Sequence, residues 1–171
     1  MRIAIIYATK SGTAKECACL LARQLQNHDV SVLDVSEVTN MDGYDTVIFG
    51  FSIRMGRALK NAKRFMKNNA ETLSQKRASY FICCGFIDCF EDYVRRTIPA
   101  ACREAAVAIS CFGGHLDPSK VKGFDKIVVK EVRNEILGGG DNGDQRDDMV
   151  LPTILDENIV QFAERIKSCA K

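Results

Sequence analysis

The chain has 171 residues, of which 46% are hydrophobic and 27% are charged, a composition that is typical of a folded globular protein and excludes a disordered chain. Its 24 basic and 22 acidic residues leave a net charge of +2, which is too balanced for a dedicated nucleic-acid-binding protein. The length predicts a single domain over residues 1–171.

The chain begins with a short apolar run, which we interpret as a first strand rather than a signal peptide. Arg2 is the one basic residue before the run, and no small-residue cleavage motif follows it. The longest strongly apolar stretch, Tyr80–Ile87, is far shorter than the roughly 18–20 residues that span a bilayer. We therefore expect a cytoplasmic protein.

Apolar, β-rich segments alternate along the chain with segments of helical periodicity, as in an α/β fold built on a parallel sheet. Four of the strand segments are nearly continuous apolar runs, which is expected of strands covered on both faces. The second is interrupted by Ser31 and Asp34, which favours an edge position. The five predicted strands are Arg2–Ala8, Val30–Val35, Thr46–Ser52, Ala78–Cys84 and Ala108–Phe112.

Between and after these strands, apolar residues recur at helical spacing. The predicted helices are Ala14–Leu25, Leu59–Leu73, Glu91–Val107 and Ile154–Cys169, the last capped near Asp156. Residues Asp125–Leu137 fit either a helix or a short strand. The glycine- and aspartate-rich segment Gly138–Asp148 follows no strand and lacks EF-hand spacing, so we interpret it as a polar connector rather than a phosphate or calcium site.

Eight cysteines are spread over the chain without a C-x-x-C motif or paired metal-ligand spacing. Cys83 and Cys84 are adjacent in a predicted strand, so their side chains should point to opposite faces and not bridge each other. We expect no metal site and interpret most of the cysteines as reduced core residues in a reducing compartment.

The clearest functional signal follows the first predicted strand, where small and hydroxyl-bearing residues lead directly into a helix. Such a turn directs several backbone N–H groups and the positive end of a helix dipole at one point. An ordinary Ser/Thr helix cap needs one hydroxyl residue, whereas here three alternate around a glycine. We therefore favour a phosphate-binding loop made of Thr9, Lys10, Ser11, Gly12, Thr13 and Ala14.

Motifs of other phosphate-binding and catalytic sites do not occur with the spacing that those sites require. Neither the dinucleotide motif G-x-G-x-x-G nor the P-loop motif G-x-x-x-x-G-K-S/T follows the first strand, and no G-x-S-x-G nucleophile motif occurs. A phosphoacceptor receiver domain would need an aspartate at the end of the third strand, where this chain has Phe51 and Ser52.

The segment Ile5-Ile6-Tyr7-Ala8-Thr9-Lys10-Ser11-Gly12, followed by Ala18 and Leu21, resembles the N-terminal signature of the flavodoxin family, with Ala14 in place of the usual threonine. The order of strands and helices over nearly the whole chain also resembles that family. The resemblance implies a flavodoxin-like, doubly wound α/β fold with a five-stranded parallel sheet of order 2-1-3-4-5 and helices on both faces. It also implies FMN as the cofactor, bound at the carboxyl ends of the strands.

Within that family, Gly50-Phe51-Ser52-Ile53-Arg54-Met55-Gly56 is similar to the corresponding segment of the menaquinone-dependent protoporphyrinogen oxidases, flavodoxin-like enzymes of haem synthesis. By this resemblance, the loops after the third and fourth strands flank the isoalloxazine ring of FMN, where an aromatic side chain can stack on the ring and an arginine can offset the charge of a reduced flavin. The first wall would be Ser52, Ile53, Arg54, Met55 and Gly56, and the second Cys84, Gly85, Phe86 and Ile87.

The resemblance leaves two functions open. The first is an FMN-dependent oxidoreductase that takes electrons from a reduced small molecule, with protoporphyrinogen as a candidate, and passes them to a quinone or a redox protein. The second is a flavodoxin-type electron carrier without a substrate of its own. The near-neutral charge and the absence of tryptophan argue mildly for the first, because flavodoxin-like carriers are commonly acidic and no tryptophan would cover the ring.

A run of basic residues without any acidic residue extends from Arg54 to Ala70. One interpretation is an ordinary solvated helix face. The other is a docking patch for an acidic protein, for substrate carboxylates or for an anionic lipid surface, which would place the protein at the inner face of a membrane. The predicted patch consists of Arg57, Lys60, Lys63, Arg64 and Lys67.

Overall fold

The computed structural model describes residues 1–114 and 153–169, and its strands form one six-stranded sheet. Five strands lie in the order β2-β1-β3-β5-β6, and β4 pairs with β3 outside this path. The strands are β1 (Arg2–Ala8), β2 (Asp29–Asp34), β3 (Thr46–Arg54), β4 (Arg57–Ala58), β5 (Arg77–Cys83) and β6 (Ala108–Cys111).

The predicted order 2-1-3-4-5 is confirmed, since β5 and β6 are the fourth and fifth of the predicted strands. All neighbours along this path are parallel, as predicted. The register of the central strands aligns Ile3 with Thr46 and Thr46 with Arg77. β2 lies at one edge of the sheet, as its interrupted apolar pattern indicates, although it begins and ends one residue earlier than predicted.

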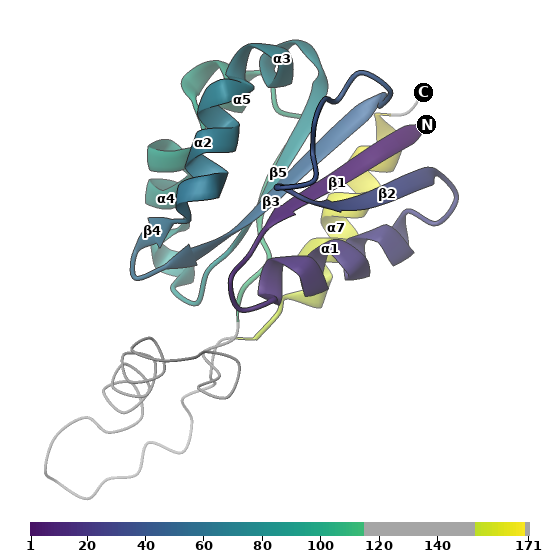
Figure 1. The fold of residues 1–171 in the computed structure, drawn as a ribbon. Helices are drawn as coiled ribbons and strands as arrows, with labels where there is room; N and C mark the ends of the chain where they lie inside the picture. Colours follow the sequence, from purple (N-terminus) through teal and green to yellow (C-terminus); the bar gives the residue numbers. More distant parts are fainter. Residues whose placement is uncertain (115–152, 170–171) are drawn as a thin grey trace, which may run out of the picture.

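Helices cover both faces of the sheet (Figure 1). One group packs on one face and comprises α1 (Thr13–Gln24) and α7 (Asp156–Ser168). The other face carries α2 (Lys60–Asn68), α3 (Ala70–Gln75), α4 (Phe90–Thr97), α5 (Ala100–Glu104) and the short 3-10 helix η1 (Ile87–Cys89) near the strand ends.

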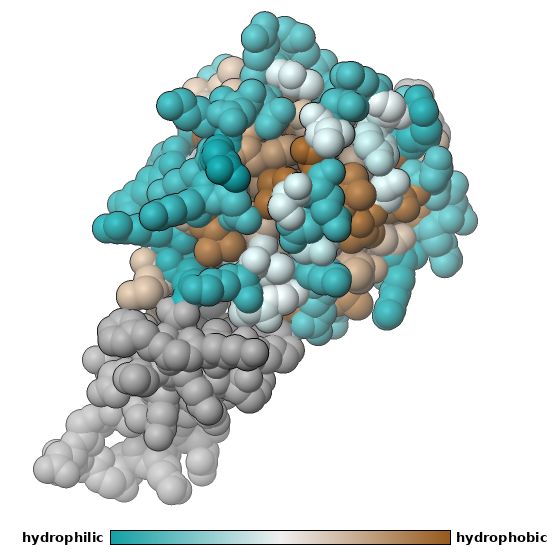
Figure 2. All heavy atoms as spheres, viewed as in Figure 1, coloured by the Kyte–Doolittle hydropathy of each residue, from teal (hydrophilic) through white to brown (hydrophobic). Residues whose placement is uncertain are grey.

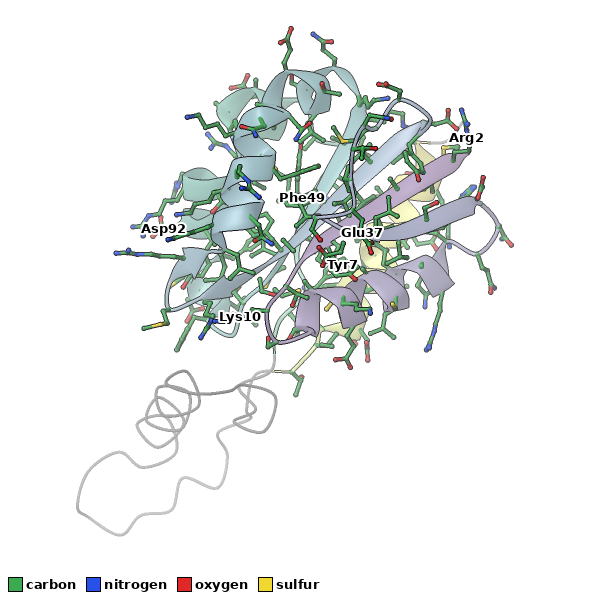
Figure 3. All side chains as sticks on the ribbon, in the orientation of Figure 1. Arg2, Tyr7, Lys10, Glu37, Phe49 and Asp92 are labelled. Atoms are coloured by element: carbon green, nitrogen blue, oxygen red, sulfur yellow. The ribbon has the colours of Figure 1, made fainter. Side chains whose placement is uncertain are left out.

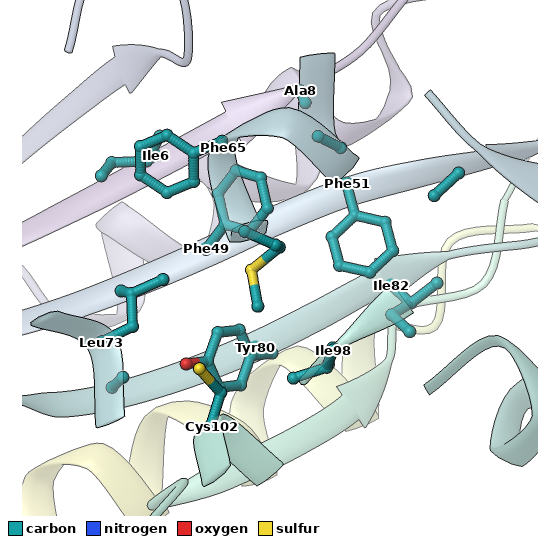
Figure 4. Close-up of a cluster of buried hydrophobic side chains, with 14 of the residues drawn as sticks. Ile6, Ala8, Phe49, Phe51, Phe65, Leu73, Tyr80, Ile82, Ile98 and Cys102 are labelled. Carbon is teal, nitrogen blue, oxygen red and sulfur yellow. The ribbon is translucent and has the colours of Figure 1, made fainter. Parts of the chain in front are cut away.

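The alternation of side chains along β3 divides the core into two clusters. Phe49 and Phe51 point toward the α2–α5 side, where the ring of Phe49 lies 4.6 Å from that of Phe65 (Figure 4). Ile48 points to the opposite side, toward α1 and α7. Both faces of β3 are thus fully covered, which explains why this strand is an unbroken apolar run in the sequence.

The structure corrects the prediction of one helix over Leu59–Leu73. The side-chain amide of Asn69 donates a 2.9 Å hydrogen bond to the carbonyl of Phe65, and α2 ends before Asn69 while α3 begins after it. The backbone N–H of Asn69 donates to the same carbonyl at 3.0 Å, so the side-chain bond adds to the last main-chain bond of α2 and does not replace it.

The prediction of one helix over Glu91–Val107 is also wrong. Ile98 adopts an extended conformation before Pro99, and α4 and α5 are separate helices on either side of this pair. Proline disfavours the helical conformation of the residue before it, so the break was visible in the sequence. Toward the other end of the chain, α7 begins at Asp156 itself and receives no side-chain cap from residues 1–114 or 153–169, so Asp156 is not the predicted cap but lies in the first turn.

Two predicted segments, Asp125–Leu137 and Gly138–Asp148, lie outside the described residues. Within residues 1–114 and 153–169, no helix combines the length and the apolar character that crossing a membrane requires.

Position 50, in the middle of β3, must be a glycine because the ring of Phe81 on β5 packs directly against it. A Cβ atom added at Gly50 would lie 1.8 Å from Cζ of Phe81, far inside van der Waals contact. Phe81 is fully buried and stacks on Phe112 at 4.5 Å, and Phe112 in turn meets Phe162 of α7 edge-on at 5.3 Å. The ring therefore has no free space to which it can move.

We predict that Gly50→Ala lowers the free energy of unfolding by about 3 kcal/mol, because the added methyl group overpacks the core around Phe81. Urea denaturation followed by circular dichroism measures the loss. Gly43→Ala is the control, since its added Cβ would meet its nearest atom at an ordinary 3.7 Å. Equal unfolding midpoints for the two variants would contradict the prediction.

Candidate functional site

The carboxyl ends of β1, β3 and β5 meet at one edge of the sheet, because the three strands are parallel neighbours. The segments that follow these strands lie at this edge, toward the lower part of Figure 1, and Lys10 extends from the first of them in Figure 3. The structure thus brings together the three segments in which the sequence places candidate site residues. In doubly wound sheets, this edge is where ligands bind.

The start of α1 is built around Gly12, which precedes the helix in a left-handed conformation with φ of 95°. The hydroxyl oxygen of Thr9 accepts a 3.0 Å hydrogen bond from the N–H of Gly12 and closes the turn, so the hydroxyl hydrogen of Thr9 stays available to another acceptor. A Cβ atom added at Gly12 would meet nothing within 4 Å. The space in front of the helix is therefore open.

No side chain among the described residues caps α1. The first N–H groups of a helix have no partner within the helix, so those of Thr13, Ala14 and Lys15 face the open space in front of Gly12. The ordinary Ser/Thr cap, the alternative interpretation of this sequence, is thus absent. An uncapped helix start with a glycine turn is an arrangement that holds an anion.

The remaining residues of this loop have different roles. The hydroxyl oxygens of Ser11 and Thr13 lie 3.4 Å apart, and either can donate to the other. Ala14 is completely buried in the cluster beneath α1, so the loop gains from it a backbone N–H but no side-chain contact. Lys10 is exposed beside the turn.

The segment after β3 forms a hairpin that the sequence analysis missed. β3 extends past its predicted end at Ser52 to Arg54, which pairs with Arg57 of β4. The two turn residues, Met55 and Gly56, have φ of 47° and 69°. Positive φ at both positions is typical of a type I′ turn, which strongly prefers asparagine followed by glycine and is strained with methionine at the first position.

Large apolar side chains are exposed on two neighbouring loops of this edge. Met55 is 65% exposed on the hairpin, and Phe86 and Ile87 are 48% and 49% exposed after β5. Among the described residues just one other large apolar side chain is this exposed, Val160 on α7. Large apolar side chains that stay exposed on the loops of one sheet edge indicate a candidate ligand-binding surface.

Ser52 and Arg54 lie on the side of β3 that faces α1, since they alternate with Phe51 and Ile53, which pack on the α2 side. Ser52 is 9% exposed, and its hydroxyl oxygen has no hydrogen-bond partner in the part of the chain that the structure describes. A buried hydroxyl without a partner is uncommon in proteins and marks a position where a ligand can supply the missing bond. Arg54 is half-buried beside it.

The second predicted wall begins with a buried thiol. The Sγ of Cys84 lies 3.5 Å from the Sγ of Cys111 at the end of β6 and 3.7 Å from the carbonyl oxygen of Phe86. The hydrogen bond with Cys111 and burial raise the pKa of Cys84, which keeps it a neutral thiol. Cys83 points to the opposite face and lies 3.6 Å from Cys17, as the alternation along a strand predicts.

Three residues of this edge are not among the predicted site residues. Cys111 contacts Cys84 across the sheet, and the amide nitrogen of Asn158 in α7 donates a 2.7 Å hydrogen bond to the carbonyl of Cys111. Gly114 lies against the same turn, since an added Cβ would stand 3.2 Å from the carbonyl carbon of Cys84. These contacts depend on strand order and on the return of the chain to this edge, which no local motif reveals. No cluster of three or more metal-ligating side chains occurs in residues 1–114 and 153–169.

Comparison with known proteins identifies several similar chains. The flavodoxin domain family matches residues 4–142. A curated protein of Escherichia coli named protoporphyrinogen IX dehydrogenase (quinone) is 28% identical over 85 residues, which cover 47% of each chain. The chain thus spans about half the length of the curated relatives that it matches.

Solved structures share the fold at low sequence identity. A short-chain flavodoxin associated with a bacterial microcompartment has a TM-score of 0.62 and 16% identity, covering 100% of this chain and 99% of its own. The flavodoxin of Fusobacterium nucleatum, solved with flavin mononucleotide, has a TM-score of 0.52 and 12% identity, with 99% of both chains covered.

The strained turn at Met55 generates a stability prediction. We expect Met55→Asn to raise the free energy of unfolding by about 1 kcal/mol, because asparagine tolerates the left-handed conformation that methionine resists. Met55→Ala removes the same side chain but keeps the strain, so it should not be stabilised. Urea denaturation of both variants tests the prediction, and equal stability of the two would show that the turn is not strained.

Proposed function

Since this chain belongs to the flavodoxin domain family, we propose that it binds FMN at the carboxyl edge of its sheet and acts as an oxidoreductase. The observation that carries the proposal is that a helix start without a side-chain cap from the described residues and several exposed apolar side chains lie at the same edge of the sheet. The helix start suits the phosphate of FMN, and the exposed apolar side chains suit its planar isoalloxazine ring.

The residues present fit the phosphate end of FMN. The N–H groups at the start of α1 and the hydroxyls of Thr9, Ser11 and Thr13 would donate to phosphate oxygens, and Lys10 would add positive charge. The unpartnered hydroxyl of Ser52 faces the same side of the sheet and would gain a partner from the ligand. Ala14, which replaces the usual threonine, would contribute its backbone N–H.

The residues of the two loops fit the ring end. Phe86 would stack on the isoalloxazine, while Met55 and Ile87 would exclude water from its faces. The backbones of Ile53, Gly56, Cys84 and Gly85 would border the ring edge. FMN, when bound, would supply transfer of a hydride or of single electrons. The guanidinium of Arg54 would stabilise negative charge at this place and so raise the reduction potential.

We further propose that the substrate is a reduced small molecule and that the acceptor is a quinone or a redox protein. Support comes from the protoporphyrinogen dehydrogenase of Escherichia coli, whose name states both a porphyrinogen and a quinone, and from the apolar loops, which leave a ring accessible. The alternative is a flavodoxin-type electron carrier, which the flavodoxin neighbours favour.

A direct experiment separates these possibilities. The purified chain is titrated with FMN and with riboflavin, followed by flavin fluorescence, and the loaded protein is then assayed for quinone-dependent oxidation of protoporphyrinogen. Oxidation with turnover supports the enzyme, whereas reduction by a redox protein without porphyrinogen turnover supports the carrier. Failure to bind FMN would contradict both.

The phosphate loop generates a prediction with a closely matched control. Gly12→Asp and Gly12→Asn add side chains of the same size to the same strained backbone position, but only aspartate adds a negative charge where the phosphate would lie. We expect Gly12→Asp to bind FMN at least about tenfold more weakly than Gly12→Asn, a difference of ~1.4 kcal/mol. Riboflavin lacks the phosphate and should bind both variants equally. Equal FMN affinities would show that the phosphate lies elsewhere.

The basic face of α2 supports an anionic redox partner. Lys60, Lys63, Arg64 and Lys67 are all exposed and form no ion pair with the described residues. Asp92 on the nearby α4 forms its 2.9 Å ion pair with Arg95 of the same helix and not with a lysine or arginine of α2. Hydrophilic side chains cover this side of the molecule in Figure 2. We propose that this face docks an acidic protein, with an anionic membrane surface as the alternative.

Salt dependence tests the docking face. In Lys60→Gln/Lys63→Gln, electron transfer to an acidic protein should be severalfold slower at low salt and less sensitive to added salt, because exposed charges are screened beyond ~8 Å at physiological ionic strength. The control, Arg23→Gln/Arg165→Gln, removes two exposed charges from α1 and α7 on the other face. If the stopped-flow rates of the two double variants respond identically to salt, the α2 face does not dock a partner and is an ordinary solvated surface.

A further inference from the structure

We propose that Cys84 and Cys111 form a redox-active dithiol at the carboxyl edge of the sheet, which stores two electrons in its reduced form and releases them when it closes to a disulfide. The two thiols come from the ends of β5 and β6, and their sulfurs lie 3.5 Å apart. A disulfide bond is about 2.0 Å long, so its formation requires an approach of about 1.5 Å. The proposal does not depend on FMN.

The surroundings distinguish this pair from the other cysteines. The N–H of Gly113 donates a 3.4 Å hydrogen bond to the Sγ of Cys111, and Cys84 contacts the same sulfur from the other side. These contacts lower the pKa of Cys111 to about 7, the hydrogen bond from Cys84 contributing most. This lowering favours the thiolate form of Cys111, and the thiolate is the form that attacks a disulfide.

The second buried pair, Cys17 and Cys83, provides a comparison within the same molecule. Its sulfurs lie 3.6 Å apart, almost the same separation. Cys83 is fully enclosed, and its hydrogen bond to Cys17 together with burial raises its pKa. Cys17 lies within α1, whereas Cys84 and Cys111 lie at strand ends beside the exposed segment of Phe86 and Ile87. All four thiols are buried, with Cys84 3% and Cys111 5% exposed, so access requires local opening, which we expect at the strand-end pair because of the exposed segment beside it.

The reaction is an exchange with a small-molecule disulfide. The thiolate of Cys111 attacks one sulfur of the reagent, whose S–S bond breaks and releases one thiolate. The thiol of Cys84 then loses its proton and attacks the sulfur of Cys111 in the mixed disulfide, releasing the second thiolate. Counted from two neutral thiols, two electrons and two protons leave the protein, one proton when the Cys111 thiolate forms and one from Cys84, and the reagent gains two thiol groups.

Closure of the disulfide would change the loop after β5. Cys84 has a single S–H hydrogen, which can be donated to the carbonyl of Phe86 at 3.7 Å or to the sulfur of Cys111. The disulfide removes this hydrogen, so the carbonyl of Phe86 loses its thiol donor. The oxidation state of the pair would then alter how firmly Phe86 and Ile87 are held.

The test uses the full chain without added flavin, equilibrated with oxidised dithiothreitol, alkylated and digested with trypsin. Cys111 is the one cysteine of the expected peptide Glu104–Lys120, and Cys84 lies in Ala78–Arg95 together with Cys83 and Cys89. We expect a loss of two of the eight thiols and a cross-linked pair of these peptides, with fragmentation assigning the bond to Cys84. Amide hydrogen exchange over residues 85–89 should become faster in the oxidised protein.

Two variants complete the test. Cys111→Ser should keep all of its remaining thiols, whereas Cys17→Ser, which breaks the comparison pair, should still lose two. Retention of all eight thiols in the unmodified chain would overturn the proposal, as would a bond from Cys111 to Cys89 or Cys83, or a bond between two chains. The unmodified chain decides the outcome even if Cys111→Ser does not fold.

Discussion

The parallel pairing of β1, β3, β5 and β6 is the constraint on which the rest of the structure depends. Parallel neighbours end at the same edge, so each connection that follows a strand begins beside the others. The turn around Gly12, the hairpin at Met55 and the loop of Phe86 are distant in sequence and become neighbours for this reason alone. The same pairing brings Cys84 beside Cys111.

The order of the sheet could be predicted because its signal is repeated in every strand. Continuous apolar runs predict strands covered on both faces, and the one interrupted run belongs to the edge strand. The glycine turn before α1 could be predicted for a related reason, since hydroxyl residues and glycine follow a strand directly. These signals are local and numerous, so single exceptions such as Ala14 do not obscure them.

The features that could not be predicted depend on single residues or on distant contacts. Met55 gave no turn signal, because methionine is unusual in a type I′ turn and its conformation is imposed by the pairing of Arg54 with Arg57. The helix break at Asn69 leaves the main-chain hydrogen bonds to and from this residue in place and involves no proline or glycine, whereas the break before Pro99 could have been recognised from proline. The bond from Asn158 to Cys111 joins residues 47 positions apart, beyond any local pattern.

The backbone hydrogen bond of 3.1 Å from the N–H of Gly114 to the carbonyl of Thr153 has a consequence for how such a chain can evolve. The bridge between Gly113 and Ile154 lies next to this bond, so the residues on either side of the intervening segment are joined at one point. Lengthening a connection whose ends are already joined costs little free energy, because the closure entropy grows only with the logarithm of length. Gly114 and Thr153 therefore mark an insertion point, where segments of different length can be exchanged while β6 and α7 keep their mutual register.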